Sequence, residues 1–439
     1  MDVGPWSGEN VGPWYRRWVQ CGCHAGKTYI RVNGKVNYDV IVVGGGPAGC
    51  AVARDMAVSG FRVLVLEEHR HIGEPVQCAG IVSLRTLDLA KVSRRVVLHA
   101  LKGMHVHSPL GTILELAGHR TYAVAVDRGR FDQELAAQAA GAGAVIICNL
   151  RVRDIAVNNR GVRVSACRGA GREEFYGRLL IGADGFNSLV ASRLGLASPV
   201  EKVAMYAAEV EVPRLQQSLM HVFLGRETAP GWFAWLVPAG AGRARVGTGV
   251  SGILKRRSFH PKRLFDDVQK NHPDFFGDMR VVHSTGGWVP VGYRRKTYGN
   301  RVMLVGDAAC QVKPVSGGGI YLGLKGAAHC ARVAAAALQS DRLDDLSGYQ
   351  KAWEQDFGEE IRSGLKYRQA FLGFSDRDME FLVRYLNKPS WQRMILRYGD
   401  IDHPSRVGEK LSIAGPWAER LAPAALGLII KGCSTLAGI

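Results

Sequence analysis

One stretch of the sequence, residues 38–67, constrains the fold more than any other. Residues 38–43 form a β-branched run of strand length, residues 50–59 have a helical composition, and residues 62–66 form a second apolar strand. Gly60 is placed to end the helix in the left-handed conformation. This succession of strand, turn, helix and strand predicts an α/β protein that is built on parallel strands.

The turn between the first strand and the helix has the pattern G-x-G-x-x-G. It is formed by Gly44, Gly46, Pro47, Ala48 and Gly49. The three glycines allow a tight turn, leave bare backbone for a pyrophosphate, and let helix and strand pack closely. The helix N-terminus adds free N–H groups and a partial positive charge. Glu67 and Glu68 end the second strand, where a carboxylate can bind ribose hydroxyls, so the unit predicts a Rossmann-type dinucleotide site.

Two later motifs narrow the nucleotide. Residues 180–185 read Leu-Ile-Gly-Ala-Asp-Gly after a short strand, and residues 305–309 read Val-Gly-Asp-Ala-Ala after another. In this the sequence resembles the FAD-dependent family of aromatic hydroxylases, flavin halogenases and geranylgeranyl reductases. The first motif is similar to the family's "DG" element and the second to its G-D-A-A element. The resemblance implies FAD as the cofactor, with contacts from Asp184, Gly185, Gly306 and Asp307.

Two further segments fit an FAD site. Gly317, Gly318 and Gly319 precede a helix that begins at Ile320, and the N-terminal dipole of that helix can stabilise negative charge on a reduced flavin. Residues 128–132 resemble the family's R-x-x-F-D segment, which implies that Arg128 approaches the cofactor. A solvated charge at a helix start is the alternative for this arginine. The DG element departs from the family at residues 188–191, where Ala191 replaces the usual arginine.

A cysteine motif points to one branch of the family. Residues 72–80 resemble the G-x-P-x-x-C-a-G element of geranylgeranyl reductases, in which the cysteine sits near the flavin ring. The resemblance implies that Cys78 and Ala79 lie at the flavin and makes Cys78 the candidate acid. A buried, inert thiol is the alternative.

A second signature of this branch is degenerate. Residues 233–238 and 245–247 are similar to Y-x-W-x-F-P…N-V-G, with Phe for Tyr, Val for Phe, and Arg245 for Asn. Alternate side chains of a strand share one face, as the wall of an apolar tunnel requires. Ordinary sheet core is the other interpretation. The substrate-site candidates are Phe233, Trp235, Val237, Pro238 and Gly247.

The resemblance implies a reaction in which reduced flavin saturates isolated C=C bonds of a geranylgeranyl or polyprenyl chain, which is carried by a membrane lipid or by a prenyl diphosphate. An FAD-dependent aromatic monooxygenase or halogenase shares the same FAD motifs, and a flavin protein that passes electrons to a quinone is the third possibility. No second dinucleotide fingerprint is found, since residues 141–143 lack the rest of the unit. The reductant is therefore expected to be NAD(P)H that docks transiently, or ferredoxin.

The motifs also suggest the domain organisation. We expect a disordered leader over residues 1–36, with no metal site at Cys21–Cys23–His24 because no second ligand pair follows. The resemblance implies a p-hydroxybenzoate-hydroxylase-like FAD domain, an inserted antiparallel-sheet substrate domain, and a C-terminal helical region. The FAD domain comprises residues 37–100, 125–200 and 281–340, the substrate domain residues 101–124 and 201–280, and the helical region residues 341–439.

Composition limits the partners. The chain has 57 basic and 39 acidic residues, which gives a formal charge of +18. Such a charge favours anionic partners or reflects an organism with basic proteins. Nucleic acid is not expected, because no nucleic-acid-binding motif accompanies the basic clusters. The nine scattered cysteines fit a cytoplasmic protein. The apolar residues 411–439 suggest contact with an anionic membrane on its inner face, or an ordinary core helix.

Overall fold

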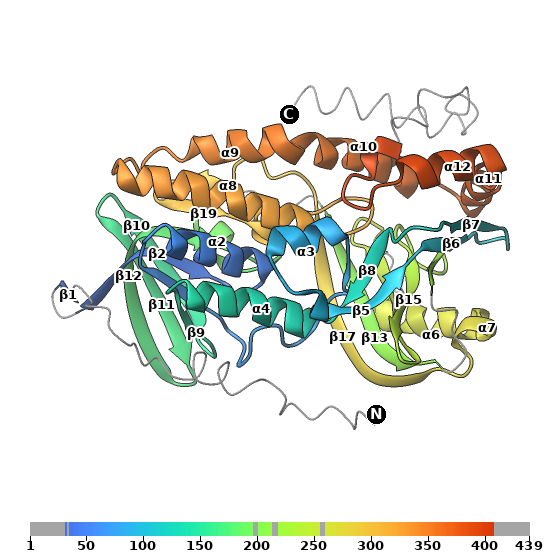
Figure 1. The fold of residues 1–439 in the computed structure, drawn as a ribbon, viewed down its shortest axis with the longest axis horizontal. Helices are drawn as coiled ribbons and strands as arrows, with labels where there is room; N and C mark the ends of the chain where they lie inside the picture. Colours follow the sequence, from blue (N-terminus) through green and yellow to red (C-terminus); the bar gives the residue numbers. More distant parts are fainter. Residues whose placement is uncertain (1–30, 33–34, 196–200, 213–217, 255–259, 408–439) are drawn as a thin grey trace.

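A computed structural model describes residues 31–32, 35–195, 201–212, 218–254 and 260–407 (Figure 1). Its largest sheet has a parallel centre in the order β9-β3-β2-β12-β19. These strands are β9 (Val145–Ile147), β3 (Val63–Leu66), β2 (Lys35–Val43), β12 (Gly171–Gly182) and β19 (Val302–Leu304). Most side chains of this centre are buried on both faces, which is why its strands read as continuous apolar runs.

The borders of this sheet are antiparallel. The hairpin of β10 (Arg151–Asn158) and β11 (Gly161–Arg168) extends it beyond β12, and β18 (Tyr298–Gly299) pairs with β19. At the N-terminal end of β2, Lys35 and Val36 pair with the two-residue strand β1 (Arg31–Val32). The predicted disordered leader therefore needs correction at its end, because residues 31–32 and 35–36 are in strands. Residues 1–30 and 33–34 lie outside the described residues.

Helices cover one face of the parallel strands. α2 (Pro47–Val58) packs against both α4 (Arg128–Gly141) and α8 (Ile320–Gln339). Figure 1 shows α8, α9 (Ser347–Trp353) and α10 (Glu359–Gly373) running along the top of the molecule. The opposite face buries the apolar side chains of the β10–β11 hairpin together with those of α5 (Leu189–Arg193).

A second sheet of seven strands has the order β17-β13-β16-β15-β14-β6-β7. Its strands are β17 (Arg280–Val291), β13 (Glu201–Glu211), β16 (Arg243–Ser251), β15 (Ala234–Gly240), β14 (Leu219–Phe223), β6 (Gly103–His107) and β7 (Ile113–Ala117). α6 (Pro261–Asn271) and α7 (Pro273–Phe276) pack on its outer face. The predicted combination of a nucleotide-binding sheet and an antiparallel sheet is confirmed, except that β14 and β6 run parallel.

One predicted boundary is wrong. We assigned residues 281–340 to the FAD domain, but β17 pairs with β13 along its whole length, from Glu211↔Arg280 to Glu201↔Val291. Eleven residue pairs, interrupted by one bulge, hold this segment in the second sheet. The chain returns to the first sheet only at β18 and β19.

A small sheet and the C-terminal helices complete the molecule. β4 (Ile81–Val82), β8 (Ala123–Val126) and β5 (Val97–Leu101) form a three-stranded sheet between the two larger ones, next to α3 (Leu84–Ala90). After α10, the helices α11 (Asp376–Leu386) and α12 (Pro389–Tyr398) lie beside β7. Within the described ranges, no helix has both the length and the hydropathy that crossing a membrane requires.

Candidate flavin and substrate site

The three FAD motifs meet at one edge of the parallel sheet. β2, β12 and β19 are neighbours and run in the same direction, so the segments that follow them lie side by side. Gly44, just after β2, has φ +101°, and a Cβ on it would stand 2.3 Å from the carbonyl oxygen of Ala183. The first two motifs therefore touch through their backbones, and only glycine allows this. Ligands of open α/β sheets bind at this carboxyl edge.

The glycine loop has one closely packed glycine and one that faces open space. A Cβ on Gly49 would lie 2.1 Å from the carbonyl oxygen of Gly44, so this glycine lets α2 approach β2. Gly46 is the N-cap of α2, with Pro47 as the first helical residue, and a Cβ on it would meet no described atom within 4 Å. The space above Gly46 is where a pyrophosphate has room at the helix N-terminus.

The two glutamates that follow β3 differ in their surroundings. Glu67 is buried; its Oε2 accepts a 2.7 Å hydrogen bond from the Gly45 N–H and its Oε1 a 2.9 Å bond from the His69 N–H. This carboxylate therefore supports the glycine loop. Glu68 is exposed and forms a 3.1 Å ion pair with Arg151. Of the two predicted glutamates, only Glu67 is held against the loop.

Asp184 and Asp307 are both placed at the sheet edge in low-dielectric surroundings. Burial raises the pKa of Asp184, whose Oδ2 accepts a 3.1 Å bond from the Val190 N–H. Among the described residues its buried Oδ1 has no hydrogen-bond partner. Burial also raises the pKa of Asp307 to about 6, against the opposing effect of Arg128. Both carboxylates are thus available to a ligand with hydroxyl donors.

The predicted glycine triplet stands beside Asp307. A Cβ on Gly319 would lie 2.9 Å from Asp307 Oδ1, and α8 begins at the next residue, Ile320. Gly317 has φ +71°, and a Cβ there would lie 3.0 Å from the ring of Trp232. A Cβ on Gly318 would lie 2.8 Å from the Lys313 side chain. The triplet therefore joins the Asp307 motif to the second sheet.

The predicted flavin-side residues converge at the start of α4. Arg128 makes an ion pair with Asp132, with Nη2 2.9 Å from Oδ2, and both side chains are largely buried. Burial opposes the charge of Arg128, but Asp132 and the Cys78 thiol more than compensate and raise its pKa. Cys78 accepts a 3.3 Å hydrogen bond from the Gly80 N–H. This arrangement joins Cys78 to Arg128, as a shared site requires.

An apolar wall faces this cluster from the second sheet. Trp235 and Val237 on β15 are buried, and with the half-buried Phe233 they pack against Ala79 and Ile81. Gly247 makes room for the Trp235 ring, because a Cβ there would lie 2.3 Å from it. Pro238 is buried but falls outside this cluster.

Three side chains that the motifs did not single out belong to the same site. Arg245 was noted as a replacement for asparagine, and its Nη1 donates to the Val126 carbonyl at 2.7 Å and to the Ala79 carbonyl at 3.1 Å. Lys313 is buried, which lowers its pKa, and donates a hydrogen bond to the Ile401 carbonyl. Trp232 packs at Gly317, with the Arg368 guanidinium 4.5 Å from its ring centroid. A lysine between the Asp307 and glycine motifs was the one available sequence signal.

The residues at this edge fit FAD. A pyrophosphate has open backbone at Gly46, and Gly185, with φ +72°, likewise has no described atom within 4 Å of a Cβ position. The unpartnered oxygen of Asp184 and the buried carboxylate of Asp307 suit hydroxyl groups of a ribityl or ribose chain. The N-terminus of α8 has a positive potential that would favour negative charge on a reduced flavin bound there.

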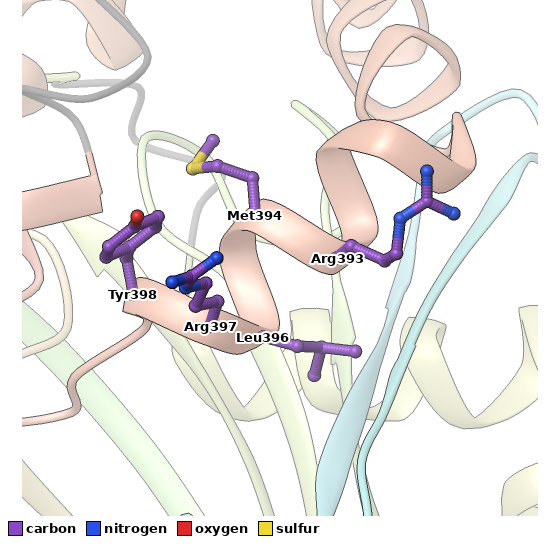
Figure 2. Close-up of a pocket in the computed structure, with 5 residues that line it drawn as sticks. All are labelled: Arg393, Met394, Leu396, Arg397 and Tyr398. Atoms are coloured by element: carbon purple, nitrogen blue, oxygen red, sulfur yellow. The ribbon is translucent and has the colours of Figure 1, made fainter.

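A separate pocket lies on α12, away from these motifs in the sequence. Figure 2 shows the pocket residues projecting from successive turns of that helix. They are Arg393, Met394, Leu396, Arg397 and Tyr398. The two arginines are exposed, whereas Met394 and Leu396 are half-buried.

Solved structures with this fold include flavoenzymes of several activities. A geranylgeranyl bacteriochlorophyll reductase-like protein of Thermoplasma acidophilum matches with a TM-score of 0.76 and 24% identity, over 86% of this chain and 99% of that one. A halogenase in complex with FAD matches with a TM-score of 0.61 and 15% identity, over 91% of this chain and 96% of that one. At these identities the likeness shows the fold.

Sequence comparison shows the family. A family model described as an FAD binding domain matches residues 37–352, and FAD is the cofactor. A digeranylgeranylglycerophospholipid reductase of Methanosarcina mazei is 34% identical over 82% of this chain and 91% of its own length. Digeranylgeranylglycerophospholipid reductase 2 of Methanococcoides burtonii is 32% identical over 82% of this chain and 91% of its own length. The chain therefore belongs to the digeranylgeranylglycerophospholipid reductase family of FAD-binding-domain proteins.

Proposed function

We propose that the protein is an FAD-dependent reductase that saturates C=C bonds in the geranylgeranyl chains of a glycerophospholipid. One observation carries the proposal: the apolar wall of Phe233, Trp235 and Val237 packs against the segment that contains Cys78, beside Arg128. An isoprenoid chain needs such an apolar surface next to the reacting groups. The choice of a glycerophospholipid as substrate follows from the names of the relatives.

The chain's own groups would hold the reactants in place. Gly46, Asp184, Asp307 and the N-terminus of α8 would bind FAD, which when reduced supplies a hydride to one alkene carbon. The apolar wall would orient the polyprenyl chain and exclude water, which matters because an isolated alkene accepts a hydride poorly. Residues of the second sheet are suited to this task because their side chains are apolar and buried.

Cys78 would provide the proton. Each saturation needs two electrons, delivered with one hydrogen as hydride, and one proton for the other alkene carbon. The thiol would give that proton and become a thiolate beside the Arg128 guanidinium, with Arg245 also near enough to act on Cys78 electrostatically. A proton from solvent would then restore the thiol. The electrons would come from NAD(P)H or ferredoxin by reduction of FAD.

The lipid substrate implies work at a membrane surface, and α12 is suited to contact one. None of its side chains is fully buried, and its exposed arginines Arg393 and Arg397 accompany the half-buried Met394, while Leu396 packs toward β7 (Figure 2). Basic side chains next to apolar ones favour anionic headgroups. The apolar segment at residues 411–439, predicted for the same role, lies outside the described residues.

The activity is testable without the physiological electron donor. The purified holoprotein would be reduced anaerobically with dithionite and offered digeranylgeranylglycerophospholipid, with a prenylated quinone in a parallel reaction. We expect lipid masses to rise in steps of two hydrogens. Reoxidation of the flavin by the quinone without any saturated product would instead favour an electron carrier. Oxygen-dependent turnover of an aromatic compound would favour a hydroxylase.

A further inference from the structure

Three histidines gather on the second sheet, away from the FAD motifs. His105 and His107 lie on β6, and His221 lies on β14 directly opposite His105 in the parallel pairing. One nitrogen from each ring lies within 4.8 Å of the others. Alternate residues of a strand share a face, so the H-x-H spacing and this register bring all three imidazoles together.

The histidines are on the face opposite the substrate wall. Met220, next to His221, packs with Trp235 and Val237, whereas His221 packs on the other side against Phe275 at 4.7 Å between ring centroids. His107 stacks on Phe223 at 4.4 Å. His107 and His221 are buried, and His105 is largely so, with a side chain 16% exposed. The flavin chemistry therefore does not account for this cluster.

Hydrogen bonding does not account for it either. His107 Nε2 and His221 Nδ1 are 3.1 Å apart, which satisfies one nitrogen of each. His105 Nε2 is buried, and within the described part of the chain it has no hydrogen-bond partner. The Glu115 carboxylate lies across the strand pair, with its Oε2 3.8 Å from His105 Nε2. A buried unpartnered nitrogen costs about 1–3 kcal/mol, which a ligand would offset.

We propose that His105, His107 and His221 form a structural binding site for a divalent transition-metal ion, with Zn²⁺ the preferred ion. Imidazole nitrogens bind Zn²⁺ at about 2.0–2.1 Å, which puts tetrahedral ligand atoms about 3.3 Å apart, close to the 3.1 Å between His107 Nε2 and His221 Nδ1. His105 Nε2 is the third donor. The Glu115 carboxylate or a water molecule completes the tetrahedron.

The surroundings agree with a closed structural ion. His107 and His221 are buried, and each turns one ring nitrogen toward the other. Phe223 and Phe275 form an apolar shell. The ion would fasten β6, which the chain contributes early, to β14, which it contributes more than 100 residues later.

The test uses full-length holoprotein purified without metal-affinity chromatography and dialysed against EDTA. Zn²⁺ is then added and unbound metal removed by gel filtration. We expect one zinc per chain by mass spectrometry of the metal, and Co²⁺ should give a tetrahedral absorption band at wavelengths beyond the flavin bands. Zn²⁺ should also raise the thermal unfolding midpoint, and EDTA should reverse the rise.

Variants separate a metal site from a packing cluster. His105→Asn removes the least buried ligand, and FAD should stay bound. Zn²⁺ binding should weaken by more than about 100-fold, which exceeds the effect of losing a residue that only hydrogen-bonds to a metal ligand. His107→Asn is the second variant, and His283→Asn, an exposed histidine of β17, is the control. The proposal is overturned if the wild-type protein retains no zinc, or if His105→Asn and His283→Asn bind zinc equally well.

Discussion

Arg245 Nη1 donates a 2.7 Å hydrogen bond to the main-chain carbonyl of Val126. This contact ties β16 of the second sheet to β8 of the small sheet, two residues before Arg128. The same nitrogen also reaches the Ala79 carbonyl, next to Cys78. One arginine thus fixes the distance between the apolar wall and the flavin side of the site.

Arg245→Ala should destabilise the protein by about 2–4 kcal/mol, because it removes the hydrogen bonds to the buried Val126 carbonyl and the half-buried Ala79 carbonyl and opens a gap. Urea unfolding of the holoprotein would measure this. Arg243→Ala is the matched control: Arg243 lies on the same strand and pairs with Glu209, which Arg245 also approaches, but its side chain is 39% exposed. Its loss should cost less than about 1 kcal/mol. Equal costs would contradict the role given to Arg245.

Gly46→Ala and Gly49→Ala should fail in different ways. Gly46 has φ −71° and open space, so alanine leaves the fold intact but occupies the room for the pyrophosphate, and FAD affinity should fall. Alanine at Gly49 meets the Gly44 carbonyl and should cost about 1–3 kcal/mol in unfolding free energy. Gly141→Ala, in α4 with open space, is the control and should bind FAD normally. Normal FAD affinity in Gly46→Ala would remove the phosphate site from this loop.

FAD binding to the apoprotein should tighten as the pH rises through about 6. Burial raises the pKa of Asp307 to about 6 in the apoprotein, so its carboxyl group is protonated below that pH. A flavin hydroxyl that donates to the carboxylate favours its ionised form. As the pH rises toward 6, the dissociation constant should therefore fall by up to about tenfold per pH unit, and above pH 6 it should level off. Flavin fluorescence titration would measure the constant. Asp307→Asn should flatten the profile, while exposed Asp341→Asn should not.

Cys78→Ala should keep FAD and slow saturation by about 10²–10⁴-fold, the usual contribution of a positioned acid. Single-turnover reoxidation of the reduced holoprotein by lipid is the measurement. Cys167→Ala changes another half-buried thiol, on β11, and should behave as wild type. Loss of flavin in Cys78→Ala would show that this thiol is structural.

Arg393→Gln with Arg397→Gln should weaken co-sedimentation with anionic vesicles by about 30-fold, since each basic side chain near such a surface contributes about 1 kcal/mol. Binding to zwitterionic vesicles should be weak and unchanged. Arg377→Gln with Arg384→Gln removes the same charge from α11 and serves as the control. Equal loss in both pairs would indicate a response to net charge rather than contact through α12.

The sequence predicted best where backbone geometry demands one residue type. A Cβ on Gly44 or Gly49 would lie only 2.1–2.3 Å from a carbonyl oxygen, so no other residue type fits there. Such requirements leave a glycine pattern that can be recognised in a single sequence. Asp184 and Asp307 follow strands that a parallel sheet must bring together. The sheet to which a strand belongs was harder to predict. The alternating sequence of β17 predicts a strand but does not indicate which of the two sheets it joins. Arg245 binds main-chain carbonyls and Trp232 packs at Gly317, each far away in the chain, and such contacts leave no local pattern.

The course of the chain through the second sheet has a practical consequence. β6 and β7 form one edge of that sheet and β17 the other, yet all three come from segments that begin and end in the rest of the molecule. Cleavage of the chain at one position therefore cannot release an intact flavin-binding fragment. Limited proteolysis should leave nicked but associated pieces, and a chimaera that exchanges substrate specificity with a relative must transplant residues 103–117 together with residues 201–291.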